Sequence, residues 1–316
     1  MINNFKIVLA IPCLNEETTI AKVIADFKAV FSILSIYVID NGSTDNTVKI
    51  AIKAGAEVLY EPLRGKGNAL RRAFAKINAD IYIVVDGDDT YDATAAPNMV
   101  QKLIDNKLDM VVGIRKHNNK KAYRSGHQLG NKIFNNLFKI MFGSQFTDIF
   151  SGYRVFSHPF TKSFPSQSSG FEIETELSVH CTNLNLSTAE IETYYTERPD
   201  GSISKLNTYI DGLRILSKML QLLRQNKPMV FYGIISFIAL IYSFVMGTPV
   251  QLTYFETGLV PRFPSLIVAV GSLIIASLIL MTGVILQTML SFQAENRHLA
   301  YLAIKSLETN QDFQDK

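Results

Sequence analysis

Three carboxylates follow a short apolar run, and their types and spacing suit them to chemistry. Residues 81–85 are Ile-Tyr-Ile-Val-Val, and Asp86, Asp88 and Asp89 come directly after them. Such a run is typical of a strand that is buried on both faces of a parallel sheet. Extended backbone points Asp86 and Asp88 the same way, where they repel each other unless a cation lies between them. The pattern predicts a hard divalent cation shared with a phosphate. The alternative is a solvated acidic turn.

Two other polar loops also follow predicted strands. Pro12, Asn15 and Glu16 come after a strand predicted over residues 5–11, and Asp40 ends a strand predicted over residues 36–40. The carboxyl ends of strands in a doubly wound sheet meet at one crevice, and such folds bind ligands there. We therefore expect these loops to meet the acidic strand end, with Asp40 placed to accept hydrogen bonds from a nucleobase or a ribose.

The elements that must position these loops alternate in type. Further strands are predicted over residues 57–60 and 110–113, and helices over residues 20–30, 47–54, 66–77 and 98–104. Repeated strand–helix units of this length indicate a mostly parallel α/β sheet with right-handed crossovers. Later in the chain, helices are expected over residues 125–142 and 172–182 and a strand over residues 190–195. The apolar face of the first of these helices can support self-association into a homo-oligomer.

The glycine-rich segment Gly65-Lys66-Gly67 opens one of the predicted helices. It lacks the spacing of a P-loop, and Leu70 stands where a dinucleotide-binding fingerprint would have its third glycine. A dehydrogenase would also leave Asp88 and Asp89 without a role. Two interpretations stay open. The glycines can bring backbone N–H groups and Lys66 towards a phosphate, or they can serve only the entry of the chain into a helix.

The composition excludes other classes of function. The net charge is only +3, so the chain has no strong basic field and we expect no nucleic-acid partner. The two cysteines, Cys13 and Cys181, form neither a disulfide framework nor a zinc pattern, which is typical of reduced thiols in a cytosolic domain.

Two long uncharged stretches lie towards the end of the chain, at residues 228–255 and 263–294. Within them, residues 229–246 and 265–286 are each long enough to cross a hydrocarbon core of about 30 Å at about 1.5 Å per residue. Basic residues flank the pair on its outer sides, which predicts both termini and the catalytic domain on the cytoplasmic face of a bacterial plasma membrane. The spans contain no charged residue, so we expect anchors and no transport pathway.

The segment before the first span alternates apolar and basic residues. Over residues 209–225, leucines and isoleucines are interleaved with Arg214, Lys218 and Arg224. This pattern predicts a helix that lies along a membrane surface, and a packing helix of the globular domain is the alternative. The expected organisation is a catalytic domain over residues 1–208, a juxtamembrane helix over 209–227, a transmembrane hairpin over 228–294 and a cytoplasmic tail over 295–316.

Several motifs together resemble those of family 2 glycosyltransferases, which have the GT-A fold. The residues that carry this resemblance are Ile11 to Glu17, Val38 to Thr47, Gly65 to Ala69 and Asp86-Gly87-Asp88. Asp148 with Ser151-Gly152-Tyr153-Arg154, and Arg198 with Gly201, Ser204 and Lys205, look like the polyprenyl-phosphate branch of that family. The resemblance covers about residues 5–210 and, in architecture, the two apolar spans.

The resemblance implies an inverting transfer from a nucleotide-diphosphate sugar to a polyprenyl phosphate such as undecaprenyl or dolichyl phosphate. By analogy, Asp86 and Asp88 would hold Mg²⁺ or Mn²⁺ with the diphosphate. The nucleoside would be held by Pro12, Asn15, Glu16 and Asp40. The cations that would face phosphates are Arg115, Arg124, Arg154, Arg198 and Lys205. Asn41 and Thr90 depart from the residues common in such relatives, which puts base identity and metal coordination in question.

The implied mechanism requires little proton transfer. A lipid phosphate is already anionic at neutral pH, whereas a hydroxyl acceptor would need a general base. The candidates for such a base are Asp89, Asp148, Glu172 and Glu174. Two alternatives to the polyprenyl-phosphate hypothesis remain. One is direct sugar transfer onto a lipid-linked saccharide or another glycolipid, and the other is a non-catalytic membrane subunit that keeps the fold for assembly.

Overall fold

The computed structural model describes residues 5–117, 135–136, 138–140, 143, 146–166, 168–170, 172–196 and 208–304. The chain divides into two compact units, Met1–Lys218 with Arg297–Lys316, and Met219–Asn296. The first unit contains the sheet with the helices that cover it, and the second contains a helical hairpin. Each unit is described by itself.

In the described part of the first unit, seven strands form one sheet in the order β3-β2-β1-β4-β6-β5-β7. The strands are β1 (Ile7–Cys13), β2 (Ser35–Asp40), β3 (Glu57–Tyr60), β4 (Ile81–Val84), β5 (Met110–His117), β6 (Arg154–Ser157) and β7 (Thr188–Tyr195). Only β6 runs antiparallel, to both β4 and β5, among these strands. The α/β prediction is confirmed as a mixed sheet of the GT-A type.

The sequence did not predict β6, which is the strand that makes the sheet mixed. It has four residues, Arg-Val-Phe-Ser, and pairs Arg154 with Val84 and Phe156 with Tyr82. A strand this short that begins with an arginine gives little periodicity to recognise. Its antiparallel direction places Arg154 beside the carboxyl end of β4.

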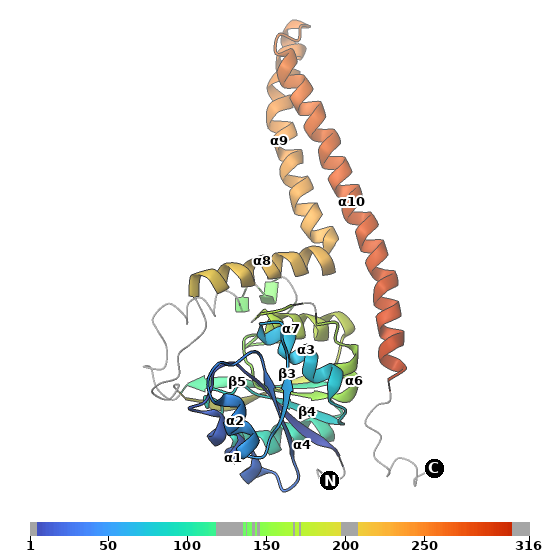
Figure 1. Ribbon diagram of the computed structural model, residues 1–316. Helices are drawn as coiled ribbons and strands as arrows, with labels where there is room; N and C mark the ends of the chain where they lie inside the picture. Colours follow the sequence, from blue (N-terminus) through green and yellow to red (C-terminus); the bar gives the residue numbers. More distant parts are fainter. Residues whose placement is uncertain are drawn as a thin grey trace, which may run out of the picture. The chain divides into compact units, whose positions relative to one another are not determined.

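Helices cover both faces of the sheet, because the buried strands are apolar on both sides (Figure 1). On one face lie α1 (Ile20–Val30) and α4 (Ala96–Asp105), where Phe27 packs edge-on against Tyr153. On the other face lie α3 (Lys66–Lys76), α6 (His158–Ser163) and α7 (Ile173–Leu184). There Phe74 of α3 packs edge-on against Tyr82 and Phe156. The short helix α2 (Thr47–Lys53) connects β2 to β3.

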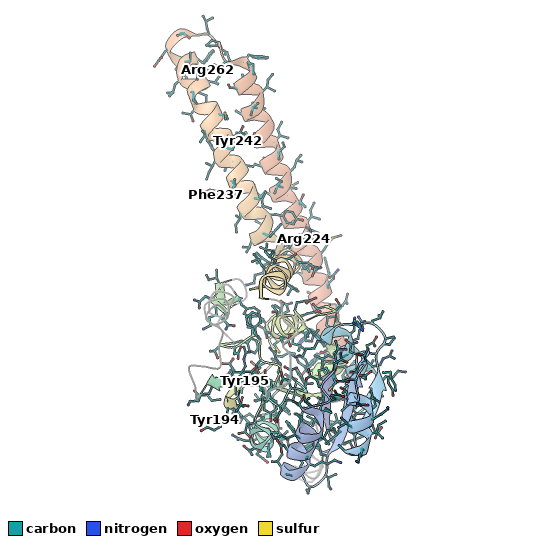
Figure 2. The ribbon with its side chains drawn as sticks, turned by 60° about the vertical axis from the view of Figure 1, so that its left-hand side comes forward. Tyr194, Tyr195, Arg224, Phe237, Tyr242 and Arg262 are labelled. Atoms are coloured by element: carbon teal, nitrogen blue, oxygen red, sulfur yellow. The ribbon has the colours of Figure 1, made fainter. Side chains whose placement is uncertain are left out.

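Helix α8 (Thr208–Asn226) precedes the hairpin of α9 (Pro228–Thr257) and α10 (Phe263–Leu302). The apolar stretches Pro228–Thr257 and Phe263–Gln293 are long and apolar enough to cross a membrane by length and composition, and most of their surface is exposed. Within the second unit, Arg224 and Arg262 lie at opposite ends of the hairpin, with Phe237 and Tyr242 between them (Figure 2).

The two hairpin helices contact each other along a row of small residues. The Ser236 hydroxyl donates to the Ala276 carbonyl, and the Ser243 hydroxyl donates to the Ala269 carbonyl, both at 2.7 Å. A Cβ atom at Gly283 would lie 3.1 Å from the Tyr232 Cβ atom, so the backbones approach closely there. Small residues and interhelical hydroxyl bonds are the usual means of helix association in lipid.

Candidate functional site

The loops after β1 and β2 are joined by Asn15. Its side-chain oxygen accepts a hydrogen bond from the Thr44 N–H at 2.7 Å, and its own N–H donates to the Ser43 hydroxyl at 2.9 Å. Asn15 has φ of 52°, a left-handed conformation that asparagine tolerates better than most residues. Pro12 pairs with Ile39 within the sheet, and Glu16 is buried where its carbonyl accepts bonds from Thr19 and Ile20 at the start of α1.

Asp40 and Asn41 both shape the loops around them. The Asp40 carboxylate accepts hydrogen bonds from the Gly42 and Ser43 N–H groups of its own turn. The Asn41 amide donates to the carbonyls of Glu61 and Leu63, and its oxygen accepts from the Gly65 N–H. Asn41 is 4% exposed, and these hydrogen bonds hold the loop between β3 and α3 in place from the protein interior. We expected its identity to bear on the donor base, and the structure gives it these backbone partners.

The acidic loop after β4 lies against the loop after β1. The Thr19 hydroxyl donates to the Gly87 carbonyl at 2.6 Å, and a Cβ atom at Gly87 would lie 2.8 Å from the Cys13 sulfur. Gly87 thus brings Asp86 and Asp88 onto the end of β1. Asp88 is buried, and its Oδ1 atom accepts from the Thr90 hydroxyl at 2.6 Å. The three loops that the sequence predicted to converge are in contact.

Lys66 is the positively charged partner of an acidic cluster that consists of Asp86 and Glu174. Its ammonium group forms ion pairs with Asp86 and, at 2.6 Å, with Glu174 Oε1 of α7. The side chains of Lys66 and Glu174 are 9% and 6% exposed, whereas Asp86 is 27% exposed. Burial opposes the charge on Lys66, but Asp86 and Glu174 outweigh it and raise the Lys66 pKa. Burial raises the pKa of Glu174, because Lys66 offsets only part of that cost and Asp86 adds repulsion.

The glycines beside Lys66 permit a close backbone approach. The N–H groups of Gly67 and Asn68 donate to the Ser169 carbonyl at 2.9 and 3.4 Å. A Cβ atom at Gly65 or Gly67 would collide with the backbone of Ser169 or Ser168. The N–H groups that open α3 are therefore bonded within the protein, and of the two interpretations of this segment the structure favours helix entry for the backbone. Lys66 itself reaches the acidic cluster.

Arg154 occupies a position that differs from our expectation. It is 1% exposed, and its guanidinium donates to the carbonyls of Ser151 and Ile149 and to the Ser178 hydroxyl. Because side chains alternate along a strand, Arg154 shares a sheet face with Phe156, and that face is covered by α7. We expected Arg154 to face a phosphate, and the structure instead places it beneath the site, as a support for the loop over residues 149–151.

That loop brings Gly152 against the ion pairs. The Gly152 N–H donates to the Tyr91 hydroxyl at 2.9 Å. A Cβ atom at Gly152 would lie 2.8 Å from the Lys66 ammonium and closer still to Asp86 Oδ2. Burial raises the pKa of Tyr91, so this hydroxyl stays protonated beside the pair. Any residue larger than glycine at position 152 would displace Lys66 or Asp86.

A second ion pair joins Arg115, near the end of β5, to Asp148 in the segment before β6. The Nε and Nη2 groups of Arg115 donate to the two oxygens of Asp148, both at 2.7 Å. The guanidinium carbon also lies 5.6 Å from the centre of the Tyr195 ring, which Figure 2 labels at the end of β7. Burial would raise the pKa of Asp148, but Arg115 outweighs it and the pKa is lowered. Arg115 is thus held in one orientation by a bidentate pair.

The remaining predicted cations, Arg124, Arg198 and Lys205, lie outside the described residues. Most of the helix expected over residues 125–142 also lies outside them, and residues 135–136 and 138–140 are helical. Of the other expected site residues, Pro12 and Asp40 lie at the carboxyl ends of β1 and β2, and Lys66 begins α3. The remaining ones, Asn15, Glu16, Asp86 and Asp88, lie on the loops after β1 and β4. Arg115 lies on β5.

The donor set fits a metal that is shared with a phosphate ligand. Among the described residues, no group of three or more His, Cys, Asp or Glu side chains could hold a metal by itself. Asp86 and Asp88 nevertheless supply hard oxygen ligands at one strand end. Mg²⁺ is commonly bound by one or two carboxylates, with phosphate and water in its other positions. These residues therefore suit an ion that binds together with a diphosphate.

A mixed sheet of this order with carboxylates at the end of β4 is the arrangement of the GT-A fold, which nucleotide-sugar transferases use. Residues 8–163 match the family model described as glycosyl transferase family 2. The chain is 55% identical over 129 residues to protein RfbJ of Shigella flexneri, a match that covers 40% of this chain and 100% of that protein. The chain belongs to glycosyltransferase family 2.

Two further likenesses agree with this assignment. Glycosyltransferase AglJ of Haloferax volcanii is 35% identical over 228 residues, which cover 72% of this chain and 75% of that protein. The crystal structure of glucosyl-3-phosphoglycerate synthase from Mycobacterium tuberculosis, in complex with Mn²⁺, UDP-glucose and phosphoglyceric acid, superposes with a TM-score of 0.59. That match has 22% sequence identity and covers 70% of this chain and 80% of the other. At this identity the superposition shows the shared fold.

The sequence missed the partners that Lys66 and Arg115 have in the site. Glu174 appeared only as one of four possible bases, and Tyr91 was not considered. Helix α7 starts within the alternating run Glu172, Glu174 and Glu176, and that run was the available signal. Since Lys66 and Glu174 are more than a hundred residues apart, only the fold could show that they meet.

Proposed function

We propose that this glycosyltransferase moves a sugar from a nucleotide diphosphate onto a polyprenyl phosphate. The observation that carries the proposal is the combination, in one chain, of the GT-A domain with two helices long and apolar enough to cross a bilayer. Helices of this kind would hold the catalytic domain at a bilayer, where it can reach an acceptor that is dissolved in the lipid. Undecaprenyl and dolichyl phosphates are lipids of this kind.

On the donor side, the loops of β1 and β2 would hold the nucleoside through Pro12, Asn15, Glu16 and Asp40. Asp86 and Asp88 would hold Mg²⁺ or Mn²⁺ together with the diphosphate. The bound ion would neutralise negative charge on the leaving nucleotide diphosphate. The bonds of Asn15 and Asp40 to the second loop keep these groups in place before the donor binds.

On the acceptor side, Arg115 would meet a phosphate, together with Arg124, Arg198 and Lys205. Asp148 and the Tyr195 ring hold Arg115 in a fixed orientation, which lowers the entropy that is lost when an anion binds. An anionic phosphate oxygen needs only to be aligned with the anomeric carbon, so orientation contributes more than proton transfer. Arg154 supports the loop that carries Gly152 and takes no direct part.

One observation favours the alternative of a hydroxyl acceptor on a lipid-linked saccharide. The raised pKa of Glu174 would make it a stronger base than an ordinary carboxylate. Of the other candidates, Asp89 pairs with Lys22 at 2.7 Å, Asp148 is held by Arg115, and Glu172 accepts a bond from the Gly170 N–H. Glu174 is itself buried against Lys66, which restricts its access to an acceptor.

We place the enzyme in the plasma membrane of a bacterium, with its catalytic domain and both termini on the cytoplasmic face. The basic residues that flank the hairpin on its outer sides support this orientation. Helix α8 would lie at the membrane surface, where its exposed Arg224 can meet anionic headgroups.

The test is transfer by the full-length protein in proteoliposomes. Radiolabelled nucleotide sugars are screened with undecaprenyl phosphate, and undecaprenol and a lipid-linked disaccharide serve as matched acceptors, each with and without Mn²⁺. We expect a product whose sugar is released by mild acid, formed only from the phosphate and only with the metal. Extension of the disaccharide would overturn the proposal in favour of the hydroxyl acceptor. Failure to transfer or hydrolyse any donor would indicate a non-catalytic subunit.

A further inference from the structure

The buried ammonium group of Lys66 forms an ion pair with the carboxylate of Asp86, which a divalent cation in the site would also bind. Lys66 pairs with Asp86, the most exposed member of the cluster, and with Glu174, which lies deeper. One cation thus faces two carboxylates. Asp86 is the one that can also be reached from the solvent, and it belongs to the acidic loop that suits a metal.

Lys66 is confined to this place. Gly152 closes one side, since even a Cβ atom there would lie 2.8 Å from the ammonium. The Tyr91 hydroxyl, bonded to the Gly152 N–H, belongs to the same wall. Because α3 begins at Lys66 and its first N–H groups are bonded to Ser169, the backbone cannot withdraw the side chain either. These contacts hold the ammonium between Asp86 and Glu174.

We infer that Lys66 and a divalent cation compete for Asp86, and that Glu174 is the second partner that keeps Lys66 in place once the cation has bound. An unpaired charge in such a site would be costly, so an ammonium displaced from Asp86 needs another carboxylate. A bound diphosphate would favour the exchange, since its negative charge attracts both cations. Lys66 and Glu174 are thus positioning residues that couple metal binding to donor binding. This inference rests on the donor site of the proposed function.

The competition predicts opposite effects for two substitutions. Lys66→Met removes the competitor, so Mn²⁺ should bind the nucleotide-free protein at least about tenfold more tightly, given the size of charge interactions at such distances. Among the described residues, Glu174→Gln leaves Lys66 with Asp86 as its only carboxylate partner, so Mn²⁺ should bind several-fold more weakly. A field effect from the changed net charge alone would give the same two directions, and the double variant separates the explanations.

If Glu174 acts through Lys66, its substitution should have almost no effect once Lys66 is gone. The double variant Lys66→Met/Glu174→Gln should therefore bind Mn²⁺ as tightly as Lys66→Met alone, whereas independent charges would give additive effects. Lys22→Met is the matched control, because Lys22 pairs with Asp89 in the same loop and is 62% exposed. We expect that variant to bind Mn²⁺ like the unchanged protein.

Binding of Mn²⁺ to the full-length protein in detergent is measured with neither donor nor acceptor present. The free ion is quantified by electron paramagnetic resonance. Circular dichroism checks the fold of each variant. If Lys66→Met does not fold, Lys66→Gln, which also removes the ammonium, replaces it in both the single and the double variant. Unchanged or weaker binding by folded Lys66→Met, or additivity in the double variant, overturns the inference and leaves the proposed function standing. Absence of Mn²⁺ binding to every nucleotide-free protein also overturns the inference and leaves the proposed function standing, because that function requires the ion only together with a diphosphate.

Discussion

Two buried cationic side chains, Lys66 and Arg154, lie near the carboxyl end of β4, and they bind different kinds of partner. Lys66 faces the carboxylates of Asp86 and Glu174, whereas the hydrogen bonds of Arg154 go to two main-chain carbonyls and a hydroxyl. Carboxylates can change partners when another cation arrives, but a carbonyl that loses its buried donor stays unsatisfied. The difference teaches that burial alone does not assign a role. Changes around Lys66 should affect activity first, and changes at Arg154 should affect stability first.

The largest expected effect is on activity, from Asp88→Asn in the acidic loop beside Lys66. Asparagine keeps an oxygen to accept the bond from Thr90 but loses the charge that a metal requires. Loss of a ligand should reduce turnover by more than the ~10–100-fold that is typical for outer-shell partners. Transfer assays and thermal melting of the full-length protein would be compared, and we expect an unchanged melting temperature. Near-normal turnover would remove Asp88 from the metal site.

The thermal stabilities of Arg154→Ala and Lys66→Met should distinguish the two buried cations most clearly. Arg154→Ala leaves the carbonyls of Ser151 and Ile149 without donors, which should cost about 3 kcal/mol of unfolding free energy. Lys66→Met leaves two carboxylates facing each other and should also destabilise the protein. Only the second variant should recover its melting temperature when Mn²⁺ is added. Equal recovery of both variants would show that the two cations are equivalent.

A smaller effect on activity is expected from Gly152→Ala. The added methyl group would intrude on Lys66 and Asp86, whose side-chain ends must then shift by a few tenths of an ångström or more. A displacement of this kind near the reacting groups should lower turnover by about 10–100-fold. Gly143→Ala is the control, because a Cβ atom at that glycine meets nothing within 4 Å, although its φ of 106° adds backbone strain. Similar turnover losses in both variants would mean that steric intrusion at Gly152 is not the cause.

The smallest effect is the contribution of the Arg115–Asp148 pair to stability at low pH. Because the folded-state pKa of Asp148 is lowered, the pair contributes stability above the pKa of the unfolded carboxyl group and loses it as the pH falls through the folded value. Asp148→Asn should therefore be less stable than the unchanged protein at neutral pH, and the gap should close in acid. Thermal melting between about pH 3 and 7 measures this. A gap independent of pH would exclude the ion pair as its source.

Much of the fold could be predicted because its signals are local. The alternation of strands and helices, the acidic end of β4 and the two apolar stretches are each visible within about thirty residues. The strand β6 was missed because four residues that start with arginine carry little pattern. The phosphate-facing role of Arg154 was implied by the family resemblance, and the face to which Arg154 points follows only from its pairing with Val84. The partners of Lys66 and Arg115 are distant in sequence, so no spacing rule could join them.

The two serine hydrogen bonds of the hairpin have a consequence for how it would enter the membrane that we propose holds it. Ser236 and Ser243 are seven residues apart, as are Ala269 and Ala276, so a slip of a single helical turn breaks both bonds at once. In hydrocarbon no water would replace them. The pair of helices should therefore insert and tilt as one rigid body, with the depth of Arg224 and Arg262 set jointly. Thickness mismatch with the surrounding lipid would then be met by tilting of the whole pair, since neither helix can slide along the other.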